Sequence, residues 1–176
     1  MAFGTWADAE RLVGAVVAEL DGADPVNTPM IRHQLEVLEW DAAEYLDDDY
    51  ARRVGLPGSI APGSMYLTFA LPTYWSPGDA PIAPNTLAPL AFRSVPCPGS
   101  AMIATEVSIA FHVPMRPGDR IHSTWVLASL TRKTLSLGPG AFLGFEITYR
   151  NQDGELVAVE NTSVFRYEPI DNGAAA

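Results

Sequence analysis

A cluster of ionisable side chains lies between residues 40 and 49 of this 176-residue chain. Asp41 and Glu44 could act as a paired acid and base, and the Tyr45 phenol could donate a proton. The alternative for both carboxylates is a solvated position at the start of a helix, where negative charge offsets the helix dipole. An ordinary phenol has a pKa of about 10, which makes Tyr45 a weak general acid at neutral pH.

The other reactive side chains are scattered along the sequence. His33, His112 and His122 lie far apart and lack the spacing of a metal site. We interpret His33 as a structural histidine on a helix rather than a catalytic group. Cys97 is the single cysteine, so an internal disulfide is excluded, and we interpret it as a bystander rather than a nucleophile. We therefore expect neither a metal ion nor a cofactor.

The composition is that of one folded, acidic domain. Hydrophobic residues make up 48% of the chain and charged residues 18%, which is typical of globular proteins. The net charge of -10 argues against nucleic acid as a partner, because phosphates would be repelled. The N-terminal segment does not resemble a signal peptide, and no apolar stretch is long enough to span a membrane. We expect a cytoplasmic protein that contacts neither membrane nor nucleic acid.

Hydrophobic periodicity predicts helices in the first third of the chain and strands in the last. The spacing predicts a helix over Thr5–Leu20, a second over about 27–38 and a third over about 42–54. The second carries an apolar stripe suited to cover a sheet. A long ordered loop is expected over 72–99, where proline recurs. Alternating residues then predict antiparallel strands, and hence an α+β fold, over 103–113, 120–130, 142–150 and 155–167.

Four segments resemble MaoC-like acyl-thioester dehydratases, in the actinobacterial branch with a FAS1-like dehydratase N-terminal domain. They read DPVNTPMIRH (24–33), IAPGSM (60–65), RPGDR (116–120) and YRNQDGELVA (149–158). The resemblance covers about residues 24–168. It implies a single hot-dog fold, in which a curved antiparallel sheet wraps round a central helix, here with an extra N-terminal helix. The implied division is an N-terminal helix (1–23), a hot-dog domain (24–170) and a disordered tail (171–176).

The resemblance also implies a reaction. Such proteins add water reversibly to the double bond of a 2-enoyl thioester, carried by coenzyme A or by an acyl-carrier protein. They work as homodimers or heterodimers of hot-dog subunits. Active members carry the acid and base as Asp-x-Asn-Pro-x-His. In this sequence Trp40 takes the place of the Asp, Ala42 and Ala43 replace the Asn and Pro, and Tyr45 replaces the His.

The departure implies a subunit without the catalytic pair, which binds substrate while a partner supplies the Asp and His. By the same resemblance, residues 42–54 compete with the second helix for the central place. Trp40 and Tyr45 either line an acyl tunnel or are ordinary core aromatics. Backbone N–H groups of Ala61, Gly63 and Ser64 either contact the thioester or form a plain turn.

Two further hypotheses remain open at this point. One is a self-sufficient dehydratase or cyclase that uses Asp41, Glu44 or Tyr45 as a relocated acid or base. The other is a non-catalytic hot-dog protein that only binds an acyl thioester. The length of the proline-rich segment 72–99 favours a bulky acyl group, such as a steroid side chain or a polyketide, over a short one.

Overall fold

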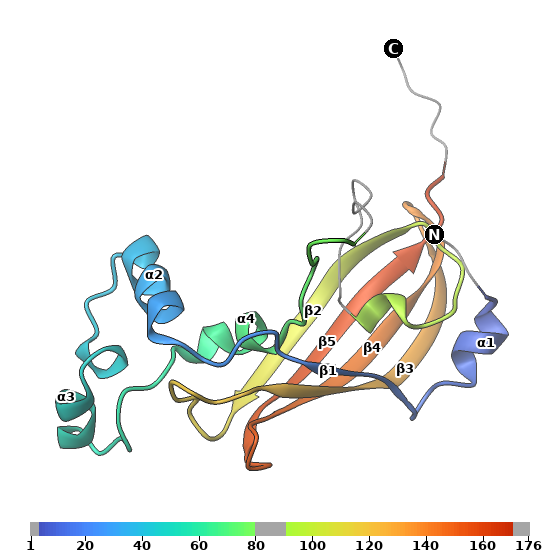
Figure 1. Ribbon diagram of the computed structural model, residues 1–176. Coiled ribbons are helices and arrows are strands. Elements are labelled where there is room, and N and C mark those ends of the chain that lie inside the picture. The colour runs from blue at the N-terminus through green and yellow to red at the C-terminus, as the bar shows by residue number, and fades with distance from the viewer. Residues whose placement is uncertain (1–3, 80–90, 171–176) are drawn as a thin grey trace.

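A five-stranded antiparallel sheet forms the body of the molecule (Figure 1). The computed structural model describes residues 4–79 and 91–170. The strands lie in the order β1-β3-β4-β5-β2. Their bounds are Val16–Asp21 (β1), Ala101–Phe111 (β2), His122–Leu135 (β3), Gly138–Arg150 (β4) and Leu156–Tyr167 (β5). The α+β order expected from the sequence is confirmed, whereas the predicted tail 171–176 and residues 80–90 of the predicted long loop lie outside the described residues.

The helices are short and precede the four C-terminal strands along the chain. None of the helices within residues 4–79 and 91–170 is long and apolar enough to cross a membrane. The α-helices are Trp6–Glu10 (α1), Thr28–Leu38 (α2), Asp48–Arg53 (α3) and Tyr66–Ala70 (α4), and the 3-10 turns are Ala43–Tyr45 (η1), Gly63–Met65 (η2) and Ala91–Arg93 (η3).

The N-terminal helix is present but much shorter than predicted. Only α1 is helical, and the Thr5 hydroxyl and the Asp8 carboxylate cap it reciprocally. The rest of the predicted helix Thr5–Leu20 is the strand β1, which pairs antiparallel with β3. Gly14 adopts a φ of 86° before the strand, and its N–H donates to the Leu127 carbonyl at 2.8 Å. Pairing with a distant strand therefore overrides the local helical spacing.

The second predicted helix is confirmed, whereas the third is divided. The Asn27 side chain accepts a hydrogen bond from the Met30 N–H at 3.0 Å and starts α2. In the predicted helix 42–54, the Asp47 carboxylate accepts from the Tyr50 N–H at 2.9 Å and begins a new helix there. The segment is consequently the turn η1 followed by α3.

The helix that packs on the sheet is α4. The chain from α2 to α3, residues 28–53, extends beyond one end of the sheet, and we call it the arm (Figure 1). This corrects the expectation that α2, or the segment 42–54, lies across the sheet. In α4, Tyr66 and Phe69 are buried, and the Tyr66 ring contacts Tyr149 of β4 at a centroid distance of 4.9 Å. From the sequence, α2 was expected on the sheet because its apolar stripe is longer than that of α4. In the structure only Ile31 and Leu35 of α2 are buried.

One face of the sheet carries the core. The register aligns Trp125, Ile147 and Glu160 on this face, and Phe92 of η3 packs edge-on against Trp125 at 5.1 Å. The strand β2 differs from the half-buried strand that alternation predicted. It is an edge strand, and its residues Ile103, Val107 and Phe111 are 41%, 54% and 54% exposed. An uncovered apolar edge strand is a natural surface for pairing with another chain.

Candidate functional site

A cleft of about 220 Å³ at the arm end of the sheet brings together three of the predicted site residues. Tyr45 comes from η1, and Ala61 and Gly63 come from the loop before α4. Phe111 and His112, at the end of β2, complete the opposite wall. We call this the sheet-end cleft.

Backbone pairing fixes both walls of the sheet-end cleft. The His112 N–H donates to the Val157 carbonyl at 2.9 Å, so the segment after β2 stays attached to β5. The Ala61 N–H donates to the Met115 carbonyl at 2.8 Å and holds the loop against that same segment. The Ala61 N–H is therefore already used within the protein, which argues against the predicted contact between this group and a thioester oxygen.

Gly63 and Ser64 remain as backbone donors. They open the turn η2, and the first N–H groups of a helical turn lack partners within it. Position 63 also leaves little room for a side chain. A Cβ at this position would lie 3.3 Å from the Phe111 ring, tighter than an ordinary contact. Ser64 is exposed and is not among the residues that line the sheet-end cleft, although its backbone N–H was predicted to contact the thioester.

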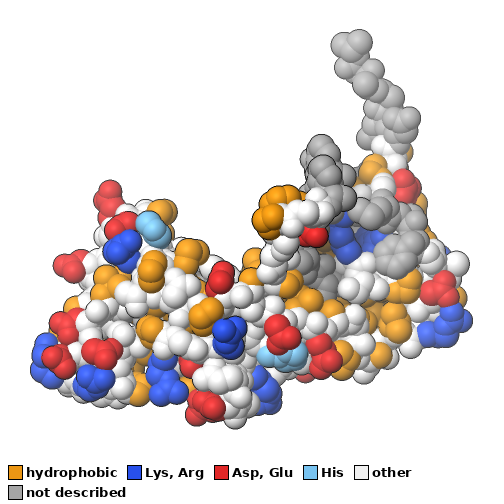
Figure 2. Space-filling model, in the orientation of Figure 1, with side chains coloured by type: hydrophobic (Ala, Val, Ile, Leu, Met, Phe, Trp, Pro, Cys, Tyr) orange, Lys and Arg blue, Asp and Glu red, His pale blue; other side chains and the backbone are white. Residues whose placement is uncertain are grey.

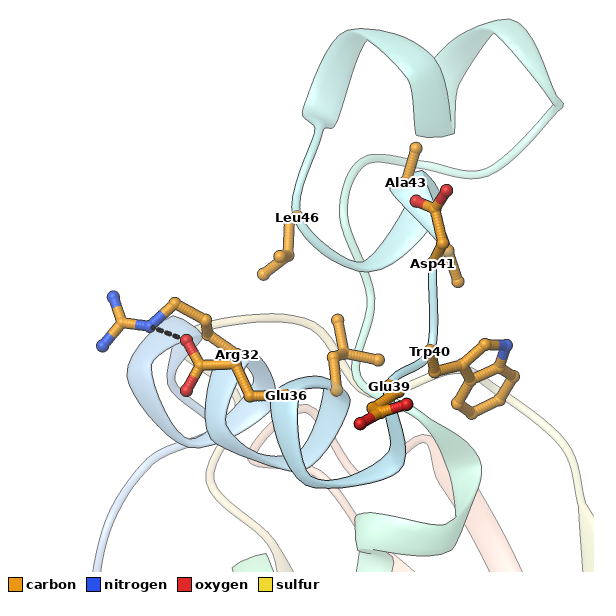
Figure 3. A pocket seen from close by; sticks show the side chains of 9 residues that line it. Arg32, Glu36, Glu39, Trp40, Asp41, Ala43 and Leu46 are labelled. Atoms are coloured by element: carbon orange, nitrogen blue, oxygen red, sulfur yellow. Dashed lines mark ion pairs between the residues drawn. The ribbon is translucent and has the colours of Figure 1, made fainter.

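The other predicted residues, Trp40 and Asp41, line a different cleft. It measures about 470 Å³ and lies between α2 and η1 (Figure 3). The Trp40 ring contacts the Tyr45 ring edge-on at a centroid distance of 5.3 Å, so these two aromatics separate the clefts. We call the larger one the acidic groove, because three carboxylates line it: Glu36, Glu39 and Asp41. Phosphate groups, such as those of the coenzyme that the resemblance implies, would be repelled there.

Tyr45 is poorly suited to exchange protons. Partial burial raises the pKa of the Tyr45 phenol, and the neighbouring Glu44 carboxylate raises it further. The phenol therefore stays protonated at neutral pH and can donate a hydrogen bond. His112 is a lining residue that the sequence did not single out. Alternation placed it on the polar side of its strand, and no motif indicated that the strand would end at a cleft.

A buried hydrogen-bond network lies directly behind Phe111. Glu160 is 6% exposed, and its Oε2 accepts from the Tyr149 hydroxyl at 2.8 Å and from the Tyr66 hydroxyl at 3.0 Å. No cation within the described part of the chain forms an ion pair with Glu160. The Tyr66 ring contacts the Phe111 ring at 6.0 Å, so the network supports the wall of the sheet-end cleft. Burial, and next the Glu160 charge, raise the pKa of both phenols.

These raised pKa values predict a loss of stability in alkali. Unfolded tyrosine has a pKa of about 10, whereas Tyr66 and Tyr149 keep their protons at that pH in the folded chain. Above this pH the unfolded state binds fewer protons than the folded state, so the free energy of unfolding falls as pH rises. While both phenols contribute, the free energy of unfolding falls by up to about 2.7 kcal/mol for each pH unit. Urea denaturation over a pH series measures it, and Tyr149→Phe should remove about half of the slope. An equal slope in that variant would contradict the assignment.

Among residues 4–79 and 91–170, no three His, Cys, Asp or Glu side chains come close enough to hold a metal ion.

The sequence matches the family model of the FAS1-like dehydratase domain region over residues 11–160. The chain belongs to this family of MaoC-like proteins. A curated relative is the probable enoyl-CoA hydratase alpha subunit of Thermomonospora curvata, 32% identical over 149 residues, which are 84% of this chain and 47% of that protein. Another is the 3-oxo-4,17-pregnadiene-20-carboxyl-CoA hydratase alpha subunit of Mycobacterium tuberculosis, 28% identical over 83% of this chain and 46% of that protein.

Solved structures confirm the hot-dog fold for this chain. A chain of the ChsH1-ChsH2 complex from Mycobacterium tuberculosis superposes with a TM-score of 0.71 at 22% identity, covering 94% of this chain and 95% of that chain. The MaoC-like dehydratase from Rhodospirillum rubrum gives 0.61 at 22% identity, covering 89% and 94%. This chain spans about half the length of the curated relatives that it matches.

Proposed function

We propose that this chain is the substrate-binding, non-catalytic subunit of a heteromeric enoyl-CoA hydratase. The observation that carries the proposal is the content of the sheet-end cleft. By the resemblance, Tyr45 takes the place of the histidine of active MaoC-like proteins, and it lines the cleft, whereas Trp40, in the place of the aspartate, lines the acidic groove. The names of the curated relatives, both alpha subunits of hydratases, support the same assignment.

The chemistry divides between two subunits. Hydration adds a hydroxyl group to C3 of the 2-enoyl thioester and a proton to C2, and enolate charge gathers on the thioester oxygen. The partner supplies the Asp and His that activate water and deliver the proton. This chain contributes the Gly63 and Ser64 N–H groups towards the thioester oxygen, and Phe111, Val113 and Met115 as an apolar wall for the acyl chain.

The open edge strand favours a partner that is also a hot-dog protein. β2 has 11 residues, and Ile103, Val107 and Phe111 on it are exposed. Pairing of β2 with a strand of the partner would extend the sheet and place the partner beside Phe111, at the mouth of the sheet-end cleft. The ChsH1-ChsH2 neighbour is itself a complex of two proteins.

The acyl group is proposed to be bulky and the reaction cytoplasmic. The name of the Mycobacterium tuberculosis relative gives a steroid thioester of coenzyme A as its substrate. That name, and the length of segment 72–99, favour a polycyclic acyl group on coenzyme A over a short chain. A chain with one cysteine suits the reducing compartment in which such thioesters are used.

Hydration of a short and of a polycyclic 2-enoyl-CoA tests the proposal. We expect no turnover by this chain alone, and turnover when it is co-expressed with the hot-dog protein encoded nearest to it. Loss of turnover is expected when the partner's Asp or His is replaced. Asp41→Asn and Tyr45→Phe in this chain should leave kcat within about threefold, because neither group transfers a proton. Turnover by this chain alone that is abolished by either variant would establish the self-sufficient alternative instead.

A further inference from the structure

The acidic groove is an open cleft on the arm, separated from the proposed thioester site by the contact between the Trp40 and Tyr45 rings. Its two walls are the C-terminal half of α2 and the chain through η1, and Leu46 points from the second wall towards α2 (Figure 3). The walls are set apart where α2 ends, because Glu39 adopts a φ of 50° and the chain reverses there. The Trp40 N–H donates to the Leu35 carbonyl at 3.0 Å and fixes that reversal.

The groove combines an apolar interior with an anionic rim. Leu35 and Leu46 supply the apolar surface, and Trp40 at one end is 46% exposed. Glu39 and Asp41 form no ion pair among the described residues, whereas Glu36 pairs with Arg32 at 3.3 Å across one turn of α2. The cation of the lining, Arg32, is therefore already paired with Glu36. No opposite charge in the lining remains for the carboxylates of Glu39 and Asp41.

Exposed apolar side chains also lie on α2 outside the groove. Val37 is 81% exposed and Leu38 is 53% exposed, and neither of them lines the groove. Exposed apolar side chains on a projecting segment are typical of a surface that another protein covers. The arm also projects beyond the sheet, where a neighbouring subunit could reach it (Figures 1 and 2).

Charge decides what kind of partner fits. A second copy of this chain has a net charge of -10 and would bring the same acidic arm, so like charges would oppose each other. A segment that carries arginine or lysine next to an apolar side chain matches both the rim and the interior.

We infer that the acidic groove is the docking site for a basic, apolar segment of the partner hot-dog subunit. The inference rests on the proposed function, because it assigns a surface to the partner named there. The groove determines which hot-dog protein binds, since an acidic or neutral segment would leave Glu39 and Asp41 facing apolar or like-charged surface. The thioester remains in the sheet-end cleft, on the other side of the Trp40–Tyr45 contact.

The test uses charge reversal with a matched control. We expect Glu39→Lys/Asp41→Lys to raise the Kd for the co-encoded hot-dog subunit by at least about 30-fold in low salt, and to weaken the salt dependence of binding. Glu10→Lys/Glu146→Lys changes the net charge equally at exposed sites outside the groove, and should change the Kd less than about threefold. Titration by calorimetry at two salt concentrations measures both values.

Three results would overturn the inference. They are an unchanged Kd in the groove variant, an equal loss in the control, and self-association of the wild-type chain that the groove reversal abolishes. The last would make a second copy the occupant. Each of these leaves the proposed function intact if the mixture still hydrates the thioester. Failure of the proposed function is a separate outcome, in which the mixture has no hydratase activity although the two subunits bind.

Discussion

Replacing Gly63 with valine should lower kcat/KM of the assembled hydratase by about 10- to 100-fold. The new side chain begins at a Cβ only 3.3 Å from the Phe111 ring, so its methyl groups must displace that ring or enter the sheet-end cleft. Forcing extra methyl groups into a filled contact costs about 1–3 kcal/mol, which corresponds to the expected factor. Because Gly63 is exposed, we expect the variant to fold.

A second substitution separates this steric effect from a general loss. Phe111→Ala removes the ring that the valine contacts, and Phe111 is 54% exposed, so its removal should be tolerated. We expect Gly63→Val/Phe111→Ala to recover most of the lost activity, which appears as a positive coupling in a double-mutant cycle. Thr68→Val is the control, at an exposed position on α4 outside the lining. An additive cycle, or an equal loss from Thr68→Val, would show that the sheet-end cleft does not hold the acyl thioester.

Sequence patterns predicted those elements whose signals are local. The start of α2 follows from the Asn27 cap and from Pro29 in the first turn, and β3, β4 and β5 follow from alternation. β1 could not be predicted in the same way. Its apolar residues also fit helical spacing, and the choice was made by hydrogen bonds to β3, more than 100 residues away in sequence.

The candidate site was predictable in part, because its loop has a motif and its walls do not. Ala61 and Gly63 were expected beside the substrate, and they do line the sheet-end cleft with Tyr45. Phe111 and His112 were missed as site residues, because alternation shows which way a side chain faces but not where a strand ends or what covers it. Glu160 was missed because its phenol partners lie 94 and 11 residues away in sequence.

Removing the Glu160 carboxylate should be the most destabilising single change at this end of the sheet. In Glu160→Ala the hydroxyls of Tyr66 and Tyr149 lose their shared acceptor while their rings stay buried. An unsatisfied buried polar group costs about 1–3 kcal/mol, so we expect the free energy of unfolding to fall by about 3 kcal/mol. Urea denaturation followed by tryptophan fluorescence measures this loss.

Two companion variants decide whether the hydrogen bonds are the cause. Glu160→Gln keeps an acceptor oxygen of the same size, so both phenols can still donate, and less than half of the loss is expected. Glu146→Ala removes an exposed carboxylate from the opposite face of the sheet and should change stability by no more than about 0.5 kcal/mol. If Glu160→Gln and Glu160→Ala lower the free energy of unfolding equally, charge or packing rather than hydrogen bonding would stabilise this region. The Tyr66 ring contacts Phe111 in the wall of the sheet-end cleft, so the network also affects substrate binding. Glu160→Gln should leave the KM of the complex nearly unchanged. Glu160→Ala should raise the KM, because the contact between Tyr66 and Phe111 loosens.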